Sequence, residues 1–352
     1  MADEAFADLY KVEGLRGIYI ASQVKGTPKS GSIGPEHLVS LITFDHGATW
    51  NNIKPPTANH EGFYIHCTKD CSLHLSQRLS QLYPVTRSVS IMSSKSAPGI
   101  IMATGVIGPN LKGHPALYVS RDAGLTWKQV LKDYYFFNMG DHGGILVAVK
   151  YFKSRGETRD ISYSIDEGET WQSYEFNEKM LRVYGLMTEP GENTTVFTMF
   201  GSASGQHQWL IIKVDLRNVF ERDCTKDDFK FWSPISVDQP MVACVLGRKE
   251  TYQRRAAKAN CYTGIDYDRP IRTEICECDF KDYQCDFGFV RDQNHCIRDK
   301  SMAFYDPYAV PTTCEPGAFY NRTKGYIKIS DDECIGGLAR NFEPDEIPCP
   351  IE

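Results

Sequence analysis

The sequence predicts an all-β protein, a partial β-propeller of about four blades followed by a small disulfide-rich module. Three observations predict this fold. Short apolar segments separated by turn residues fill the first 220 residues, an eight-residue motif occurs three times among them, and ten of the twelve cysteines follow residue 220. The predicted domains are therefore 1–220 for the partial propeller and 221–352 for the cysteine module.

The apolar segments of the first 220 residues are typical of short buried strands. They are rich in β-branched side chains and are bounded by clusters of Gly, Pro, Asp and Asn. Examples lie at 18–21, 99–103, 145–149, 195–199 and 210–214. Helical periodicity is scarce, and many short strands with regular turns predict a sandwich, a barrel or a propeller.

The repeated motif favours the propeller. Ser/Thr-x-Asp-x-Gly-x-Thr-Trp occurs at 43–50, 120–127 and 164–171 and resembles the Asp box. The Asp accepts backbone N–H bonds inside a tight turn, the Gly supplies a positive φ, and the Trp packs its ring between neighbouring sheets. Because the motif recurs about once per blade, we predict structural roles for Asp45, Gly47, Trp50, Asp122, Gly124, Trp127, Asp166, Gly168 and Trp171.

The spacing of the copies sets the number of blades. The second and third copies start at 120 and 164, and this interval of 44 residues is close to one four-stranded blade. The first and second start 77 residues apart, so a degenerate blade or a long insertion lies between them. About four blades do not close a ring. We expect the first blade, near Gly14, to present an open face containing Leu15, Ile18 and Ile20.

The cysteines predict an oxidising compartment. A dense, even-numbered cluster is typical of a disulfide framework. Zinc is disfavoured because Cys276 and Cys278 are separated by one residue and no matching Cys or His pair follows. We therefore predict no metal and no cofactor. Sequons at Asn193 and Asn321 predict glycosylation of a secreted chain.

Charge and local patterns exclude several functions. The net charge of −6 argues against nucleic acid as a partner. We interpret the basic residues between 248 and 258 as a solvated surface, and Asp141–His142 as a turn rather than a catalytic dyad. The N-terminus has no signal-peptide pattern and no apolar run reaches the length of a membrane span. A disulfide-rich chain without an export signal is expected to be part of a longer exported protein.

The cysteine-rich segments resemble the ten-cysteine module of the sortilin family of sorting receptors. The resemblance rests on the segments 224–232, 244–247, 252–255, 261–264 and 276–289. Further segments, at 71–82, 96–99, 140–145, 184–191 and 325–329, are similar to the sortilin-related branch of the family. Thr170 agrees with that branch, since sortilin itself has a cysteine before this Trp.

The resemblance implies a ten-bladed propeller with a wide tunnel, of which this chain would hold the blades from about the seventh onward. It also implies a receptor that binds peptide or protein cargo in the lumen and carries it between Golgi, endosomes and the cell surface. The best-known cargo contacts lie in earlier blades, so the ligand-binding residues of this chain are left unknown. Adaptor proteins would bind a tail absent from the chain, and membrane attachment would need a transmembrane segment that is also absent.

The resemblance further implies how the cysteines pair. The implied disulfides are Cys67–Cys71, Cys224–Cys261, Cys244–Cys276, Cys278–Cys334, Cys285–Cys296 and Cys314–Cys349. The alternative function is an Asp-box glycosidase of the sialidase type. It is disfavoured because the Phe/Tyr-Arg-Ile-Pro motif is absent and no Tyr or Glu lies in a recognisable catalytic context, so we predict no enzyme activity and no catalytic residue.

Overall fold

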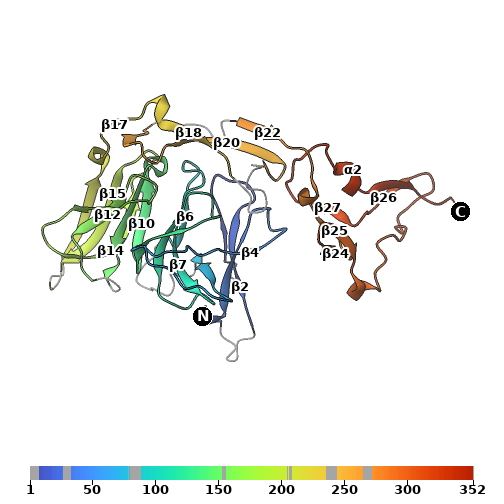
Figure 1. Ribbon diagram of the computed structural model, residues 1–352, viewed down its shortest axis with the longest axis horizontal. Helices are drawn as coiled ribbons and strands as arrows, with labels where there is room; N and C mark the ends of the chain where they lie inside the picture. The colour runs from blue at the N-terminus through green and yellow to red at the C-terminus, as the bar shows by residue number, and fades with distance from the viewer. Residues whose placement is uncertain are drawn as a thin grey trace.

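A computed structural model describes residues 8–26, 33–77, 79, 89–152, 156–203, 205, 208–234, 244–264 and 272–351. Four antiparallel sheets stand side by side like part of a fan, and the cysteine-rich part of the chain runs across one end of them (Figure 1). The predicted fold class, an all-β partial propeller followed by a disulfide-rich module, is confirmed.

The four sheets are four blades, as predicted. Their strands pair in chain order, except that β5 and β6 both pair with β7. The first blade has β1 (Leu9–Lys11), β2 (Tyr19–Val24), β3 (Leu38–Thr43) and β4 (Asn51–Asn52). The second has β5 (Ser72–Leu75), β6 (Ile91–Ser93), β7 (Ile101–Gly108), β8 (Ala116–Ser120) and β9 (Lys128–Lys132). The third has β10 (Tyr135–Gly140), β11 (Ile145–Lys150), β12 (Asp160–Ser164) and β13 (Gln172–Glu175). The fourth has β14 (Leu181–Thr188), β15 (Val196–Ala203) and β16 (Trp209–Asp215).

The long interval between the first two motif copies is an insertion and not a degenerate blade. β5 pairs with residues 105–108 of β7 and β6 pairs with 101–103, so the innermost strand of the second blade is made in two pieces. The connection from β4 to β5 adds further length and contains the Cys67–Cys71 disulfide. The helical turn expected at 76–82 lies largely outside the described residues.

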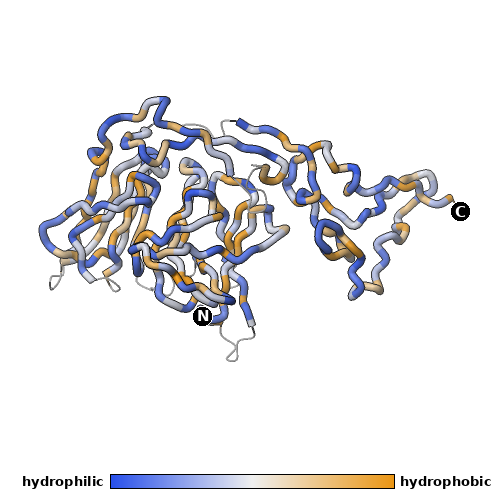
Figure 2. Tube along the Cα trace, viewed as in Figure 1, coloured by the Kyte–Doolittle hydropathy of each residue, from blue (hydrophilic) through white to orange (hydrophobic). Residues whose placement is uncertain are grey.

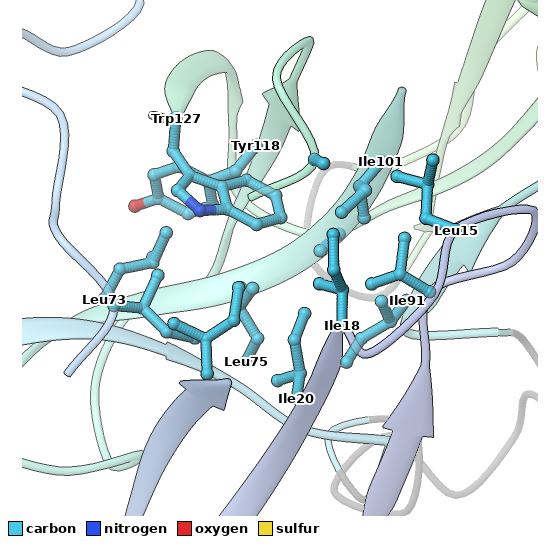
Figure 3. Close-up of a cluster of buried hydrophobic side chains, with 14 of the residues drawn as sticks. Leu15, Ile18, Ile20, Leu73, Leu75, Ile91, Ile101, Tyr118 and Trp127 are labelled. Carbon is cyan, nitrogen blue, oxygen red and sulfur yellow. The ribbon is translucent and has the colours of Figure 1, made fainter. Parts of the chain in front are cut away.

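Apolar clusters between neighbouring blades form the core. Figure 3 shows the cluster between the first two blades, where Ile18 and Ile20 meet Leu73, Leu75 and Ile101. Leu15 is 4% exposed and Ile18 and Ile20 are 1% exposed. The expectation that these three residues form an open face was therefore wrong. A strand alternates between two faces, and the sequence shows that one is apolar without showing which neighbour covers it.

The three motif tryptophans share one orientation and differ in burial. Trp127 lies in the cluster between the first and second blades, and Trp171 packs against the cluster between the second and third. Each therefore packs toward the preceding blade. In the described part of the chain no blade precedes the first, and Trp50 is accordingly 37% exposed. The predicted packing role thus holds for Trp127 and Trp171, whereas Trp50 packs against no second sheet.

The cysteine module has two parts. The first runs along the ends of the blades (Figure 1) and contains β17 (Arg222–Asp223), β18 (Phe229–Trp232), β19 (Cys244–Val245), β20 (Arg248–Arg255), β21 (Cys261–Tyr262) and β22 (Arg272–Ile275). The second extends beyond the first blade and contains β23 (Tyr283–Cys285), β24 (Phe289–Asp292), β25 (His295–Arg298), β26 (Phe319–Arg322), β27 (Tyr326–Lys328), α2 (Ala339–Phe342) and β28 (Asp345–Pro348).

Disulfides replace an extensive core in the second part of the module. Its main buried cluster consists of Cys278, Tyr283, Cys334, Ala339 and Phe342. In Figure 2, by contrast, apolar positions lie along the blade strands, and β8 is buried over its whole length. All twelve cysteines are bonded, in the pairs Cys67–Cys71, Cys224–Cys261, Cys244–Cys276, Cys278–Cys334, Cys285–Cys296 and Cys314–Cys349. These are the pairs that the family resemblance implies.

Candidate functional site at the blade–module junction

Each Asp-box carboxylate is consumed inside its own turn. Asp45 accepts hydrogen bonds from the backbone N–H of Thr49 at 2.8 Å and from its hydroxyl at 2.6 Å. Asp122 and Asp166 accept the same two bonds from Thr126 and Thr170. Burial raises the pKa of Asp166. The hydrogen bonds to its carboxylate lower the pKa by more than burial raises it, so the net shift is downward. The three carboxylates therefore hold turns and are not placed to act on a substrate.

In two of the three copies the variable residue after the Asp contacts the module. His46, Ala123 and Glu167 occupy this position and all have positive φ, at 59°, 63° and 60°. The Nδ1 of His46 lies 3.2 Å from a carboxylate oxygen of Asp331 in the module. Glu167 accepts a hydrogen bond at 2.8 Å from Arg254, also in the module. The Asp-box turns thus form the surface on which the module sits.

Arg254 joins the module to two blades. One guanidinium nitrogen donates to Glu167 and another donates at 2.8 Å to the carbonyl of Arg121, next to the second Asp box. The guanidinium carbon lies 5.0 Å from the ring centre of Trp232. The side chains of Arg254 and Glu167 are 5% and 7% exposed. This geometry is a buried, hydrogen-bonded ion pair with a cation–π contact.

The interpretation of the basic run as a solvated surface is wrong for two of its residues. Arg254 and Arg255 are both buried. Arg248 is half-buried beside Glu333, whereas Lys249 and Lys258 are exposed. The run lies mostly on β20. Alternation along this strand covers Arg254 and leaves Lys249 exposed, whereas Arg255, at the end of the strand, is covered by its contacts with Cys261 and Gly144.

Arg255 satisfies carbonyl groups where the third blade meets the module. It donates to the carbonyls of Cys261 at 2.7 Å and Gly144 at 2.8 Å, and also to that of Ile165. Burial lowers the pKa of the Arg255 guanidinium, and the negative charge of Asp141 opposes this shift. The residue therefore closes the turn ends of β10–β11 and β12–β13 against the module.

Asp141 holds the module from the opposite side. It lies in the turn η3 (Asp141–Gly143), and both it and His142 have positive φ. Its two carboxyl oxygens accept the backbone N–H groups of Thr263 and Gly264, each at 2.9 Å. Burial raises the pKa of Asp141 to about 6 despite these bonds. The segment is a turn, as predicted, but its role in docking the module was not foreseen.

The first blade contacts the module at a third place. The hydroxyl of Tyr252 on β20 donates to the carbonyl of Gly14 at 3.1 Å, and Arg16 lies 3.2 Å from Glu333. Gly17 has φ +70°, and a Cβ atom there would lie 2.7 Å from the side chain of Leu246. Glycine is therefore required at this position by both its backbone and its close approach to the module.

Two cavities lie along the junction. One, of about 700 Å³, is lined by charged groups of the second and third Asp boxes that already pair with one another, such as Arg121 and Lys128 with Glu169. The other, of about 570 Å³, lies between the first Asp-box hairpin and both parts of the module, at β19 and at the residues around β23. We call this second space the blade–module cavity. It is the better candidate for a ligand site, because its lining combines apolar side chains with several carboxyl groups.

No cysteine offers a thiolate to a metal. Within the described residues, two clusters bring three metal-ligating side chains together, namely Cys224, Asp228 and Cys261, and Cys278, Asp282 and Cys334. Both cysteines of each cluster are joined in a disulfide, so only one carboxylate remains in each. A single carboxylate does not make a structural metal site.

The two sequons differ in their surroundings. Asn321 is exposed on β26. The amide of Asn193 is half-buried and donates at 3.3 Å to the carbonyl of Gly264 in the module. The same prediction was made for both asparagines, because the sequon pattern contains no information on distant contacts.

Comparison with known proteins decides the family. The sequence model described as "Sortilin, neurotensin receptor 3" matches residues 1–186, and its C-terminal counterpart matches 188–349. The chain belongs to the sortilin family. The division between the two family models falls within β14, so it does not follow a boundary between sheets.

Individual family members match along the whole chain. The sortilin-related receptors of Mus musculus and Homo sapiens are each 42% identical over 99% of this chain and 16% of their own length. The human VPS10 domain-containing receptor SorCS3 is 32% identical over 97% of this chain and 27% of its own length. The similarity to the sortilin-related branch, SorLA, predicted from the motifs, is confirmed. The chain thus spans less than a third of the curated relatives it matches.

No helix in the described part of the chain is long and apolar enough to cross a membrane.

Proposed function

We propose that this chain is part of the lumenal ligand-binding region of a sorting receptor, which binds peptide or protein cargo and carries it between Golgi, endosomes and the cell surface. The relatives with which it shares its whole length are named as receptors. The observation that carries the proposal is the junction itself. Three Asp-box turns, Arg254, Arg255 and Asp141 join the module to the blades, and a cavity lies along this junction.

Enzyme activity is disfavoured by the state of the carboxyl groups. The Asp-box carboxylates are saturated by hydrogen bonds within their turns. Asp282 and Asp332 form a side-chain hydrogen bond to each other, which leaves no space for a sugar between them. We propose a non-enzymatic binding protein that needs no cofactor. Adaptor proteins would engage a cytoplasmic tail outside this chain.

An uptake experiment tests the receptor role. The complete protein that contains this chain is expressed in cultured cells with an extracellular epitope tag, and labelled antibody is followed from the cell surface. A sorting receptor delivers the antibody to endosomes and then to the Golgi region. Antibody that stays at the surface would overturn the proposal. Hydrolysis of a fluorogenic sialoside by the purified protein would favour the glycosidase alternative.

A further inference from the structure

The blade–module cavity has an apolar part. From the first blade, Phe44 and Ala48 contribute to its lining, and from the module Val245, Leu246 and Ile329 do so. Ala48 packs directly against the small cluster that the last three residues form. A volume of about 570 Å³ is within the range of ligand sites, and it is large enough for one long side chain and its flanking groups.

The remainder of the lining is acidic. It includes five carboxyl groups, Asp45, Glu277, Asp279, Asp282 and Asp332, against two cations, Lys281 and Arg291. Arg291 donates to the carbonyl of Tyr283 and is thus already engaged. Asp282 and Asp332 are half-buried and share a side-chain hydrogen bond. The lining therefore carries an excess of negative charge beside an apolar wall.

A buried hydroxyl adds an independent observation. Tyr283 is 1% exposed and forms part of the lining. Its hydroxyl has no hydrogen-bond partner among the described residues. Burial raises the pKa of this hydroxyl, and the charges of Glu343, Asp282 and Asp332 raise it further. A buried polar group without a partner costs free energy, and this one belongs to a residue of the cavity lining.

We propose that the blade–module cavity binds the basic side chain, arginine or lysine, of an extended peptide, with the carboxyl groups of Asp282 and Asp332 as its counter-charge. The inference rests on the proposed function, because it takes the ligand to be peptide cargo. The aliphatic stem of the side chain lies along Leu246 and Ile329, and its cationic end reaches the carboxyl pair. Charge-assisted hydrogen bonds to two carboxylates fix its orientation.

Acid releases such a ligand. Burial, together with the charge and the hydrogen bond of Asp332, raises the pKa of Asp282 to about 7. With this pKa the pair shares a proton in about half of the molecules at pH 7, is mostly deprotonated at pH 7.5, and holds one proton in a mildly acidic endosome, where it attracts a cation less. The charged groups that surround the pair are Glu277, Asp279, Lys281, Arg291, Asp45, Glu343 and, on β27, Lys328. Affinity for the cation should fall roughly 20-fold from pH 7.5 to 5.5, by proton linkage to a single group of pKa about 7.

Binding of a pair of synthetic peptides to the full chain tests this proposal. The probe is fluorescein-labelled phenylalanyl-arginine amide, and its partner carries citrulline, which has nearly the same shape and no charge. We expect the arginine peptide to bind at least tenfold more tightly than the citrulline peptide at pH 7.5. Fluorescence anisotropy at pH 7.5 and 5.5 should show the acid-induced loss for arginine alone. Equal binding of the two peptides, or no binding of either, would overturn the proposal.

Three variants locate the site. Asp332→Asn should weaken arginine-peptide binding at least tenfold, whereas Asp227→Asn, an exposed carboxylate outside the cavity, should leave it unchanged. Ala48→Phe fills the cavity from the blade side without altering the module, so it should abolish binding even if Asp332→Asn folds poorly. Binding retained by Ala48→Phe would refute the site. Failure here leaves the antibody-uptake experiment unaffected, so it is distinguishable from failure of the receptor proposal.

Discussion

Arg254 of the module and Glu167 of the third Asp box form an ion pair, 2.8 Å apart, in which both side chains are almost fully buried. The pair joins residues 87 positions apart in the sequence. It therefore couples the position of the module to the integrity of an Asp-box turn.

Arg254→Ala should lower the free energy of unfolding by about 3–5 kcal/mol, because it leaves the charge of Glu167 buried without a partner. Urea denaturation under oxidising conditions measures the loss. Arg254→Met combined with Glu167→Gln should be less harmful than Arg254→Ala, since neither charge remains. Lys249→Ala, on the exposed side of the same strand, is the control and should change stability by less than about 0.5 kcal/mol.

Stability should respond to pH through Asp282. Its pKa is raised to about 7 in the folded chain, so between about pH 4 and 7 the folded state binds more protons than the unfolded state. The free energy of unfolding from this group therefore falls as the pH rises through that interval. Asp141, with a pKa raised to about 6, acts in the same direction, whereas buried His74 acts against it because burial lowers its pKa.

The measurement is the difference in melting temperature between pH 5.0 and 7.5, compared in the wild type and in Asp282→Asn. The variant removes the titrating group, so its melting temperature should fall less, or rise more, on going to pH 7.5. Identical pH profiles of the two proteins would show that the carboxyl pair does not titrate in this interval.

Removal of the Cys224–Cys261 disulfide should lower the free energy of unfolding more than removal of the Cys67–Cys71 disulfide. Cys224 and Cys261 are separated by 37 residues, and Cys67 and Cys71 by four. Chain entropy alone gives a loss of about 4 kcal/mol for the longer loop and about 2 kcal/mol for the shorter one when each pair is replaced by alanine. The carbonyl of Cys261 also accepts a bond from Arg255, which adds to the first loss. Equal melting temperatures for the two double variants would contradict this ranking.

The features predicted correctly from the sequence are those set by local chemistry. Asp45 and Thr49 lie four residues apart and hydrogen-bond within one turn, and the other two copies form the same turn. The contacts that form this turn therefore lie within the motif itself. The spacing of the motif copies likewise predicted about four blades. The burial of Arg254 was not predictable in this way, because its partner, Glu167, is distant in sequence and lies in the turn between two strands of the third blade.

The sequence also did not predict which neighbouring sheet covers each apolar face. Ile18 and Ile20 were recognised as one apolar face, and the structure buries them against the second blade instead of leaving them open. Trp50 and Trp127 end two copies of the same motif, yet Trp50 is exposed and Trp127 is buried, because their neighbouring sheets differ. Packing partners of this kind are a property of the assembled blades and not of any single segment.

Glycosylation should occur at Asn321 and not at Asn193. Asn321 is exposed, whereas the amide of Asn193 donates to the carbonyl of Gly264, so a glycan there would disrupt the junction. After expression through a secretory pathway, the Asn321→Gln variant should lose the gel shift that an N-glycosidase produces. Asn193→Gln should migrate as the wild type does. A shift lost in Asn193→Gln instead would mean that the junction is open during or after secretion.

The outer strand of the fourth blade should make the isolated chain self-associate. Among the described strands, β16 pairs with β15 alone, and its residues Trp209 and Ile211 are 68% and 81% exposed. Met187 on β14 lies on the same open face and is 52% exposed. An edge strand with free backbone groups and exposed apolar side chains is a template for pairing with another chain.

Size-exclusion chromatography with light scattering, at two protein concentrations, measures this association. Ile211→Lys places a charge on the edge and should shift the wild-type oligomers toward monomer. Phe304→Lys removes an equally exposed apolar side chain that lies outside any strand, so it should leave the distribution unchanged. A wild-type chain that is monomeric at both concentrations would show that the open face of β14–β16 is tolerated in water. An equal effect of both substitutions would assign the association to general surface hydrophobicity and not to the strand edge.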